Sequence, residues 1–268
     1  MKLSISNIAW DRADDDKVFT LLNKYNFEGV DIAPSIVFDN ILDVSDFELN
    51  KFKNKISYYK VCIPGMQSLL YQKPKYNMFN EYRSKTLSYL KKIIELADKL
   101  DVKVLVFGSP KNRYIKDLNK KEAYIKAISF FEEIADYSQK RDIIFCIEPN
   151  ALEYNCNFIN NTQEAIQIVK DVNSKGFGLH LDSAVMYLNK EDVIKSISDS
   201  INYLRHFHVS EPFLKPITNG QVDHKKISGI LKEINYNKWV SIEMKKVEAN
   251  NMKNLELCLE YVAEIYNQ

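Results

Sequence analysis

Four acidic or imidazole side chains occur, one after another, at the ends of four successive apolar runs in the second half of the chain. They are Glu148, Asp182, His208 and Glu243. Each follows the previous one by about the length of one βα unit, so in a barrel of parallel strands all four would reach the same rim. Three carboxylates gathered beside an imidazole repel one another unless a cation lies among them. The spacing therefore predicts an open site for one divalent ion, with Mn²⁺, Mg²⁺, Co²⁺ and Zn²⁺ as candidates.

Two more histidines lie on the same predicted strands, two residues before a predicted ligand. His180 precedes Asp182, and His206 precedes His208. Side chains two residues apart on a strand share a face, so these histidines should lie deeper on the face that carries the ligands. There they could orient the ligands or contact the substrate. The other interpretation is that they are interior polar groups satisfied by hydrogen bonds.

Weaker candidates come from the loops that follow the other predicted strands. Polar side chains in such loops can bind substrate hydroxyls, and an arginine beside a small-residue turn can bind a phosphate or carboxylate. For each of them the alternative is a solvated or structural side chain. The substrate-binding residues predicted in these loops are Asn7, Gln67, Arg113, Glu153 and Glu211. Trp10 and Asp31 also follow predicted strands, and Trp10 could stack on a sugar or belong to the core.

These side chains need a scaffold, and the apolar period alternates between two residues and 3.6 residues along the whole chain. Strands are predicted at residues 3–9, 29–33, 59–63, 103–107, 143–147, 177–181, 204–209 and 239–244. Helices are predicted at residues 14–25, 46–57, 82–100, 121–139, 162–172, 190–200, 224–234 and 254–266, with Thr162 and Asp223 as helix caps. Strict alternation favours a parallel sheet with right-handed crossovers.

Eight βα units in 268 residues predict an α/β fold, a (β/α)₈ TIM barrel that forms a single domain over residues 1–268. A doubly wound open sheet is the rival architecture. It normally carries a glycine-rich phosphate loop after an early strand, and the sequence has neither GxGxxG nor GxxxxGK[ST]. The barrel is therefore the fold that we expect.

The composition excludes several classes of protein. Lys and Arg number 37 against 36 Asp and Glu, for a formal charge of +1, which argues against a nucleic-acid partner. The cysteines at 62, 146, 156 and 258 have no zinc or CxxC spacing and are expected to be reduced. No signal-peptide core or 18-residue apolar run is present, so we expect a cytoplasmic protein without a membrane partner. A homodimer is among the assemblies that the sequence allows.

Four sequence segments carry a resemblance to a known family. They are IEPN at 147–150, GLHLDS at 178–183, HFHVSEP at 206–212 and WVSIEM at 239–244. The chain resembles the xylose isomerase-like TIM-barrel family of sugar (phosphate) isomerases and epimerases. The resemblance implies that Glu148, Asp182, His208 and Glu243 bind one divalent metal ion, with Mn²⁺ expected first. It also implies a sugar substrate, with Glu148 and Glu243 moving a proton through an enediolate.

The chain departs from the ketose epimerases of that family at two places. Val185 stands where those enzymes often carry a histidine, and the segment from Pro212 to Lys215 lacks their arginine. Both departures argue against a free ketohexose. A metal-dependent lyase or dehydratase acting on a keto sugar or keto acid therefore stays an alternative, as does a non-catalytic sugar-binding barrel. Endonuclease IV, a DNA-repair relative, needs a histidine-rich trinuclear zinc site, which four histidines in all do not supply.

Overall fold

The computed structural model describes residues 1–267, with the side chain of Asn219 excepted, and Gln268 lies outside the described residues. Within that range eight parallel strands form one sheet in the order β2-β1-β8-β7-β6-β5-β4-β3. The strands are β1 (Lys2–Ser6), β2 (Gly29–Asp31), β3 (Gly65–Met66), β4 (Val104–Phe107), β5 (Ile144–Ile147), β6 (Phe177–Asp182), β7 (Leu204–Ser210) and β8 (Trp239–Glu243). Two isolated parallel bridges, Gly29 with Cys62 and Ile32 with Met66, join β2 to β3. The predicted TIM barrel is confirmed.

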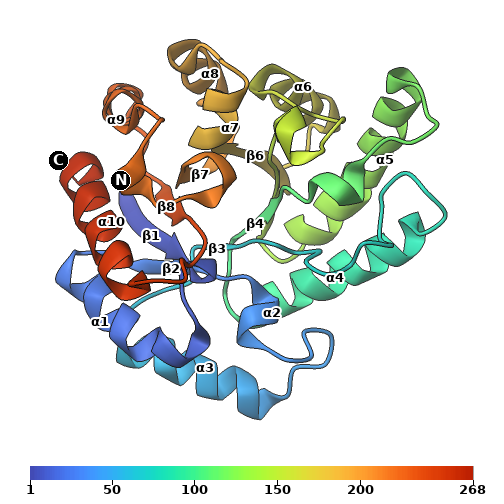
Figure 1. Ribbon diagram of the computed structural model, residues 1–268. Coiled ribbons are helices and arrows are strands. Elements are labelled where there is room, and N and C mark those ends of the chain that lie inside the picture. Colours follow the sequence, from blue (N-terminus) through green and yellow to red (C-terminus); the bar gives the residue numbers. More distant parts are fainter. Residues whose placement is uncertain (268) are drawn as a thin grey trace.

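Helices surround the strands as an outer ring (Figure 1). They are α1 (Asp15–Lys24), α2 (Pro34–Val37), α3 (Asp46–Tyr58), α4 (Arg83–Lys99), α5 (Lys120–Gln139), α6 (Thr162–Val172), α7 (Ser183–Leu188), α8 (Val193–Ser200), α9 (His224–Glu233) and α10 (Asn251–Tyr266). The last helix, α10, packs beside α1, so the two ends of the chain lie close together (Figure 1).

Side-chain caps explain where several helices begin. Ser45 and Glu48 form a reciprocal capping box at the start of α3. The predicted cap of α9 is present, because Asp223 accepts a hydrogen bond from the amide of Lys226. At α6 the capping residue is Asn161, one residue before the predicted Thr162, because the Asn161 side chain accepts the amide of Glu164.

The third strand differs most from its prediction at residues 59–63. The aromatic and β-branched residues there are typical of a strand, but α3 runs to Tyr58 and Lys60 then turns with a φ of 55°. Cys62 makes one bridge to β2, and Pro64 cannot donate to a strand ladder. The named strand β3 therefore begins only at Gly65.

Other elements also depart from the sequence-based ranges: β2 ends at Asp31, α10 begins at Asn251, and α2 was not predicted. The first predicted strand extends to residue 9, but β1 ends at Ser6 and residues Asn7–Ala9 form a 3₁₀ turn. One helix was predicted at 190–200. The structure has α8 there, preceded by the additional short helix α7 directly after β6, whose first turn is capped by Asp182. Helix α7 begins with Ser183 and carries Val185, whose amide donates to Asp182.

Five of the strands alternate polar with apolar residues, whereas β4 and β5 are apolar throughout. The largest continuous apolar core lies between the sheet and the helices, and it includes Phe131 stacked on Phe177 at 4.8 Å between ring centroids. Alternate residues of β1, β2, β6, β7 and β8 are polar and nevertheless buried; they include Ser4, Asp31, His180, His206 and Ser241. Buried polar groups need partners, so this half of the barrel interior is built for more than packing. None of the described helices is both long and apolar enough to cross a membrane.

Candidate metal centre and active site

Four side chains gather at the carboxyl ends of β5 to β8. Glu148 directly follows β5, Asp182 ends β6, His208 lies near the end of β7, and Glu243 ends β8. Each offers one ligand atom, and these atoms all lie within 4.8 Å of one another. Glu148 and Glu243 keep 13% and 14% of their side-chain surface exposed, whereas His208 is fully buried. The site is therefore partly accessible to solvent at the two glutamates and inaccessible at the imidazole.

His208 lies between two carboxylates that approach its two ring nitrogens. Its Nδ1 is 3.3 Å from Oε2 of Glu243, and its Nε2 is 3.5 Å from Oδ2 of Asp31. Burial alone would lower the pKa of His208, but Glu243 and Asp31 hold that pKa well above its usual range. Without a metal ion, these two carboxylates favour the protonated form of the ring. A cation that takes the place of its proton would leave Asp31 to orient the ring.

The two deeper histidines lie below this cluster. His180 and His206 are fully buried, and the edge of His180 packs against His208 at 4.1 Å between ring centroids. His206 Nε2 lies 3.0 Å from the same Asp31 oxygen, and this pairing holds the pKa of Asp31 low despite its burial. Burial and the neighbouring rings lower the pKa of His180, so it is neutral. Both histidines support the cluster from the barrel interior.

The ring nitrogens of these three histidines are close to carboxylates but badly aligned with them. None of the nitrogens of His180, His206 and His208 makes a well-directed hydrogen bond within the described residues. Poorly satisfied buried donors are costly. A cation bound by the outer nitrogen of His208 would give that nitrogen a strong partner, so the residues present fit a divalent ion.

Asp182 is held firmly in place by its neighbours. Its Oδ2 accepts a hydrogen bond of 2.6 Å from the Ser210 hydroxyl, and its Oδ1 accepts the amide of Val185 at 2.9 Å. The Ser210 oxygen in turn accepts the amide of Ala184. Burial and the nearby Glu243 nevertheless raise the pKa of Asp182 to about 6. The carboxylate is therefore oriented in advance for a ligand that carries positive charge.

Glu148 has the most perturbed carboxyl of the cluster. Burial, Glu243 and Asp182 together raise its pKa to about 8. Its carboxylate lies against Gly108, where any Cβ would collide with Oε2. Arg113 is completely buried and donates from Nη2 to the main-chain oxygen of Glu148 at 2.7 Å. A buried carboxyl with a perturbed pKa in a cavity wall marks a candidate functional residue.

The three carboxylates of the cluster, Glu148, Asp182 and Glu243, line a cavity of about 430 Å³. Of the predicted substrate-binding residues in the loops, Gln67 and Glu153 line this cavity. Gln67 also donates from Nε2 to Ser6. The cavity wall also includes Ser68, Ser109, Asn150, Asn155, Tyr154, Val185, Phe213 and Leu214. Among the described residues, the lining contains no lysine or arginine.

Three other predicted residues do not line this cavity. Arg113 turns to the main chain of Glu148, as described above. Glu211 is buried, and its carboxylate accepts the amides of Gln221 and Val222 and lies 3.0 Å from Nε2 of His224. Asn7 is buried and accepts the amide of Ala33 at 2.8 Å. Each of these side chains stabilises a loop of the barrel rim, and their predicted contact with a substrate remains untested.

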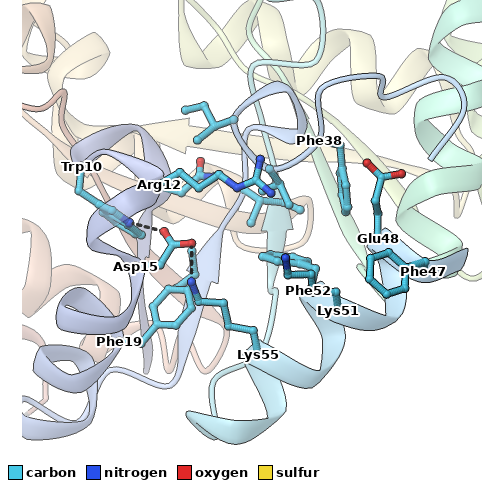
Figure 2. Close-up of a pocket in the computed structure, with 15 residues that line it drawn as sticks. Trp10, Arg12, Asp15, Phe19, Phe38, Phe47, Glu48, Lys51, Phe52 and Lys55 are labelled. Atoms are coloured by element: carbon cyan, nitrogen blue, oxygen red, sulfur yellow. Dashed lines mark hydrogen bonds and ion pairs between the residues drawn. The ribbon is translucent and has the colours of Figure 1, made fainter. Parts of the chain in front are cut away.

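Asn7 and Trp10 line a second cavity of about 370 Å³ between α1, α2 and α3 (Figure 2). Trp10 and Lys55 both turn toward Asp15, at 2.8 Å and 3.1 Å, and Phe38 and Phe52 form part of the apolar wall (Figure 2). This cavity contains none of the clustered carboxylates or histidines. Trp10 thus lines this second cavity and does not face the four clustered side chains.

Asp31 is the residue of the site whose role the sequence did not indicate. It follows a short apolar run, like several other aspartates of the chain, and its partners come from β7, far away in the sequence. Only the closure of the barrel brings β2 across from His206 and His208. The sequence did offer one signal of this role, a carboxylate in an apolar strand, because buried carboxylates are rarely left without a partner.

Comparisons with known proteins agree with this geometry. The chain is 28% identical over 132 residues to D-psicose 3-epimerase of Ruminiclostridium cellulolyticum, covering 48% of this chain and 44% of that protein. It is 24% identical over 123 residues to L-ribulose 3-epimerase of Methylomonas sp., covering 46% and 43%. The matches thus span less than half the length of these relatives.

Solved structures match over the whole chain. A D-psicose 3-epimerase from Clostridium cellulolyticum, crystallised with D-tagatose, has a TM-score of 0.83 at 20% identity and covers 100% of this chain and 98% of its own. A 3-keto-D-glucoside 4-epimerase from E. coli has a TM-score of 0.81 at 13% identity, covering 98% and 99%. At these identities the likeness shows the fold. The xylose isomerase-like TIM barrel model matches residues 19–262, and the chain therefore belongs to that family.

Proposed function

We propose that this protein is a divalent-metal-dependent epimerase or isomerase of a sugar or sugar derivative. The observation that carries the proposal is the convergence of Glu148, Asp182, His208 and Glu243 on one point, where the three carboxylates line the cavity. Relatives named as ketose 3-epimerases support a sugar as the substrate. The absence of a cationic side chain from the described lining favours an uncharged sugar over a sugar phosphate.

The ion would be held by the four converging side chains. The ligand set of three carboxylates and one imidazole suits Mn²⁺ first, with Mg²⁺, Co²⁺ and Zn²⁺ as alternatives. When bound, such an ion polarises a carbonyl and makes the neighbouring C–H more acidic. Asp31 would orient the imidazole of His208 from below, and Ser210 would hold Asp182.

Glu148 and Glu243 are the acid–base pair in this proposal. They come from β5 and β8, on either side of the two strands that carry Asp182 and His208, so they can approach a substrate from different sides. Both carboxylates line the cavity, where they could take a proton from a substrate and return one to it. A base on each side of a planar intermediate can remove a proton from one face and return one to the other, which inverts a stereocentre.

Deuterium exchange tests this mechanism. Metal-loaded protein is incubated with ketoses in D₂O, and product is followed by NMR and mass spectrometry. We expect deuterium at the carbon next to the carbonyl, and we expect Glu148→Gln and Glu243→Gln each to lower turnover by roughly 10²–10⁴-fold while metal stays bound. Glu248→Gln, an exposed residue after β8, is the matched control.

The outcomes also separate the rival functions. Loss of water from the substrate would identify a lyase or dehydratase. Binding of sugar with no turnover and no exchange would identify a sugar-binding barrel. Full activity of both glutamine variants with metal bound would contradict the two-glutamate mechanism.

A further inference from the structure

The second cavity, between α1, α2 and α3, has the size and composition of a small-molecule site. Its volume of about 370 Å³ falls within the ordinary range for ligand pockets. Such pockets are lined mainly by apolar and aromatic side chains, with a few polar groups that orient the ligand. The aromatic residues that line this one are Trp10, Phe19, Phe38, Phe47 and Phe52 (Figure 2).

Most of these rings are held in place by packing. Trp10 lies edge-on to Phe19 at 6.4 Å between ring centroids, and Phe38 lies edge-on to Phe52 at 5.7 Å. The indole Nε1 of Trp10 also donates to Asp15 at 2.8 Å. Because the rings are oriented in advance, an apolar ligand would not have to order them on binding.

The lining of the second cavity also contains charged groups, three of them cations and two of them carboxylates. Both carboxylates already have partners within the protein. Asp15 accepts from Trp10 and from Lys55, and Glu48 accepts from Ser45 in the capping box of α3. The carboxylates of the lining are therefore not free to attract a cationic ligand.

Two cations of the lining, Arg12 and Lys51, lack a strong partner. Arg12 lies 3.8 Å from Asp39, whose side chain is 99% exposed, and exposed pairs of this kind contribute little. Lys51 is exposed and takes part in no ion pair among the described residues, unlike Lys55 one turn later in α3. The cavity therefore presents positive charge that no carboxylate of the protein offsets closely.

A buried amide also lines the second cavity. Asn7 is 5% exposed, and its Oδ1 accepts the amide of Ala33 at 2.8 Å. Its Nδ2 has no hydrogen-bond partner among the described residues. Buried donors are seldom left without a partner, and an oxygen atom of a ligand in this cavity could provide one.

We propose that the second cavity binds an organic carboxylate whose apolar body is of the size of an aromatic ring. Arg12 and Lys51 would offset the charge of the carboxylate, and the body would be buried among the aromatic side chains. An uncharged sugar fits this lining poorly, because most of its hydroxyls would lose water without gaining a partner. The site is thus separate from the proposed active site and does not depend on the proposed function.

Strand β2 lies between this cavity and the metal cluster. Val30 and Ile32 line the second cavity, whereas Asp31 between them contacts His206 and His208. This is the alternation of side chains expected along a strand. A ligand in the cavity would therefore contact β2 and should slow hydrogen exchange at the amides of Val30 and Ile32.

Tryptophan fluorescence can follow binding directly. The chain has two tryptophans; Trp10 lines the cavity, and Trp239 lies in β8. Trp239→Phe leaves Trp10 as the reporter. This protein is titrated with 3-phenylpropionate, with 3-phenylpropionamide, which keeps the ring and lacks the charge, and with propionate, which keeps the charge and lacks the ring. We expect 3-phenylpropionate to change the Trp10 emission saturably and to bind at least roughly tenfold more tightly than the other two.

Variants of the lining place the binding in this cavity. Replacing both cations, by Arg12→Met with Lys51→Met, should weaken 3-phenylpropionate binding by roughly tenfold and leave binding of the amide unchanged. Lys53→Met, on α3 but outside the lining, is the matched control and should bind like the parent. Ile36→Phe puts a larger side chain into the cavity and should weaken both ligands. Melting temperatures show that each variant is folded.

Saturable binding of 3-phenylpropionate that needs the two cations and protects the amides of Val30 and Ile32 would support the proposal. Equal binding of the carboxylate and its amide would overturn it, as would unchanged affinity in the double variant or in Ile36→Phe. An emission of Trp10 that does not respond up to the solubility limit of the probe would also overturn it. None of these measurements involves sugar turnover, so their failure is distinct from a failure of the proposed function.

Discussion

Oδ2 of Asp31 lies 3.5 Å from Nε2 of His208, across the barrel from the strand that carries this histidine. The other ring nitrogen of His208 points to Glu243 in the proposed ion site. A carboxylate behind a metal-binding imidazole fixes the ring orientation and strengthens the ligand. Asp31 is therefore a positioning residue for the proposed metal centre.

Replacing Asp31 should weaken metal binding without removing any ligand. We expect Asp31→Asn to lower the affinity for Mn²⁺ or Co²⁺ by about 10- to 100-fold. Asp39→Asn, at a fully exposed aspartate, is the control and should bind like the parent. Calorimetric titration of metal-free protein measures both. Equal affinities of the two variants would show that Asp31 only satisfies His206.

The stability of the metal-free protein should fall as the pH rises. Burial and neighbouring carboxylates raise the pKa of Glu148 to about 8 and that of Asp182 to about 6. The folded protein then binds more protons than the unfolded chain between their ordinary pKa values and these raised ones, so stability decreases from about pH 4.5 to about pH 8.

Thermal unfolding without metal measures this effect. We expect the melting temperature of the metal-free protein to drop across that window through these two groups. Glu148→Gln should flatten the dependence, because the amide cannot ionise. Saturating Mn²⁺ should restore the melting temperature most strongly at high pH. A melting temperature that rises with pH in Glu148→Gln and parent alike would contradict the assignment.

Two glycines offer a matched pair of substitutions. A Cβ on Gly108 would collide with Glu148, whereas a Cβ on Gly229, inside α9, meets nothing within 4 Å. Gly108→Ala should displace the Glu148 carboxylate and reduce metal affinity and turnover. Gly229→Ala should stabilise the protein by up to about 1 kcal/mol, through helix propensity, with unchanged metal binding. Unfolding and metal titrations of both variants test the contrast.

Glu211 should affect stability more than substrate binding. Its carboxylate accepts the amides of Gln221 and Val222 and contacts His224, which closes the loop after β7. Glu211→Gln loses part of this buried set, and we expect a loss of about 1–3 kcal/mol in the free energy of unfolding. Glu260→Gln on the exposed side of α10 is the control. A large change in KM with unchanged stability would instead favour the substrate contact predicted from the sequence.

The sequence predicted best what local pattern determines. Strands β4 to β8 are buried apolar runs bounded by helices, so their positions and the order of the polar residues at their ends could be read directly. The third strand could not, because Cys62 and Met66 make separate bridges, to Gly29 and Ile32, on either side of a proline. The residue pattern at 59–63 fits the end of a helix as well as it fits a strand.

Long-range contacts limited the prediction of the site. The pairing of Asp31 with His206 and His208 depends on barrel closure, which no local pattern encodes. Glu211 has the sequence position of a rim ligand, but its side chain turns into the loop. Residue type and spacing thus located the rim, and only packing decides which way each rim side chain turns.

Two isolated bridges join β2 and β3 in the described part of the chain, and we call this junction the seam. By contrast, β7 and β8 pair over five consecutive residues. Amide protons at Val30 and Ile32, which bond across the seam, should exchange with solvent sooner than those of β7. Asp31 lies between them, so each opening of the seam would draw it away from His208. Release of the proposed ion and opening of the seam should then be coupled, and loading with Mn²⁺ should slow hydrogen exchange at Val30 and Ile32 more than elsewhere.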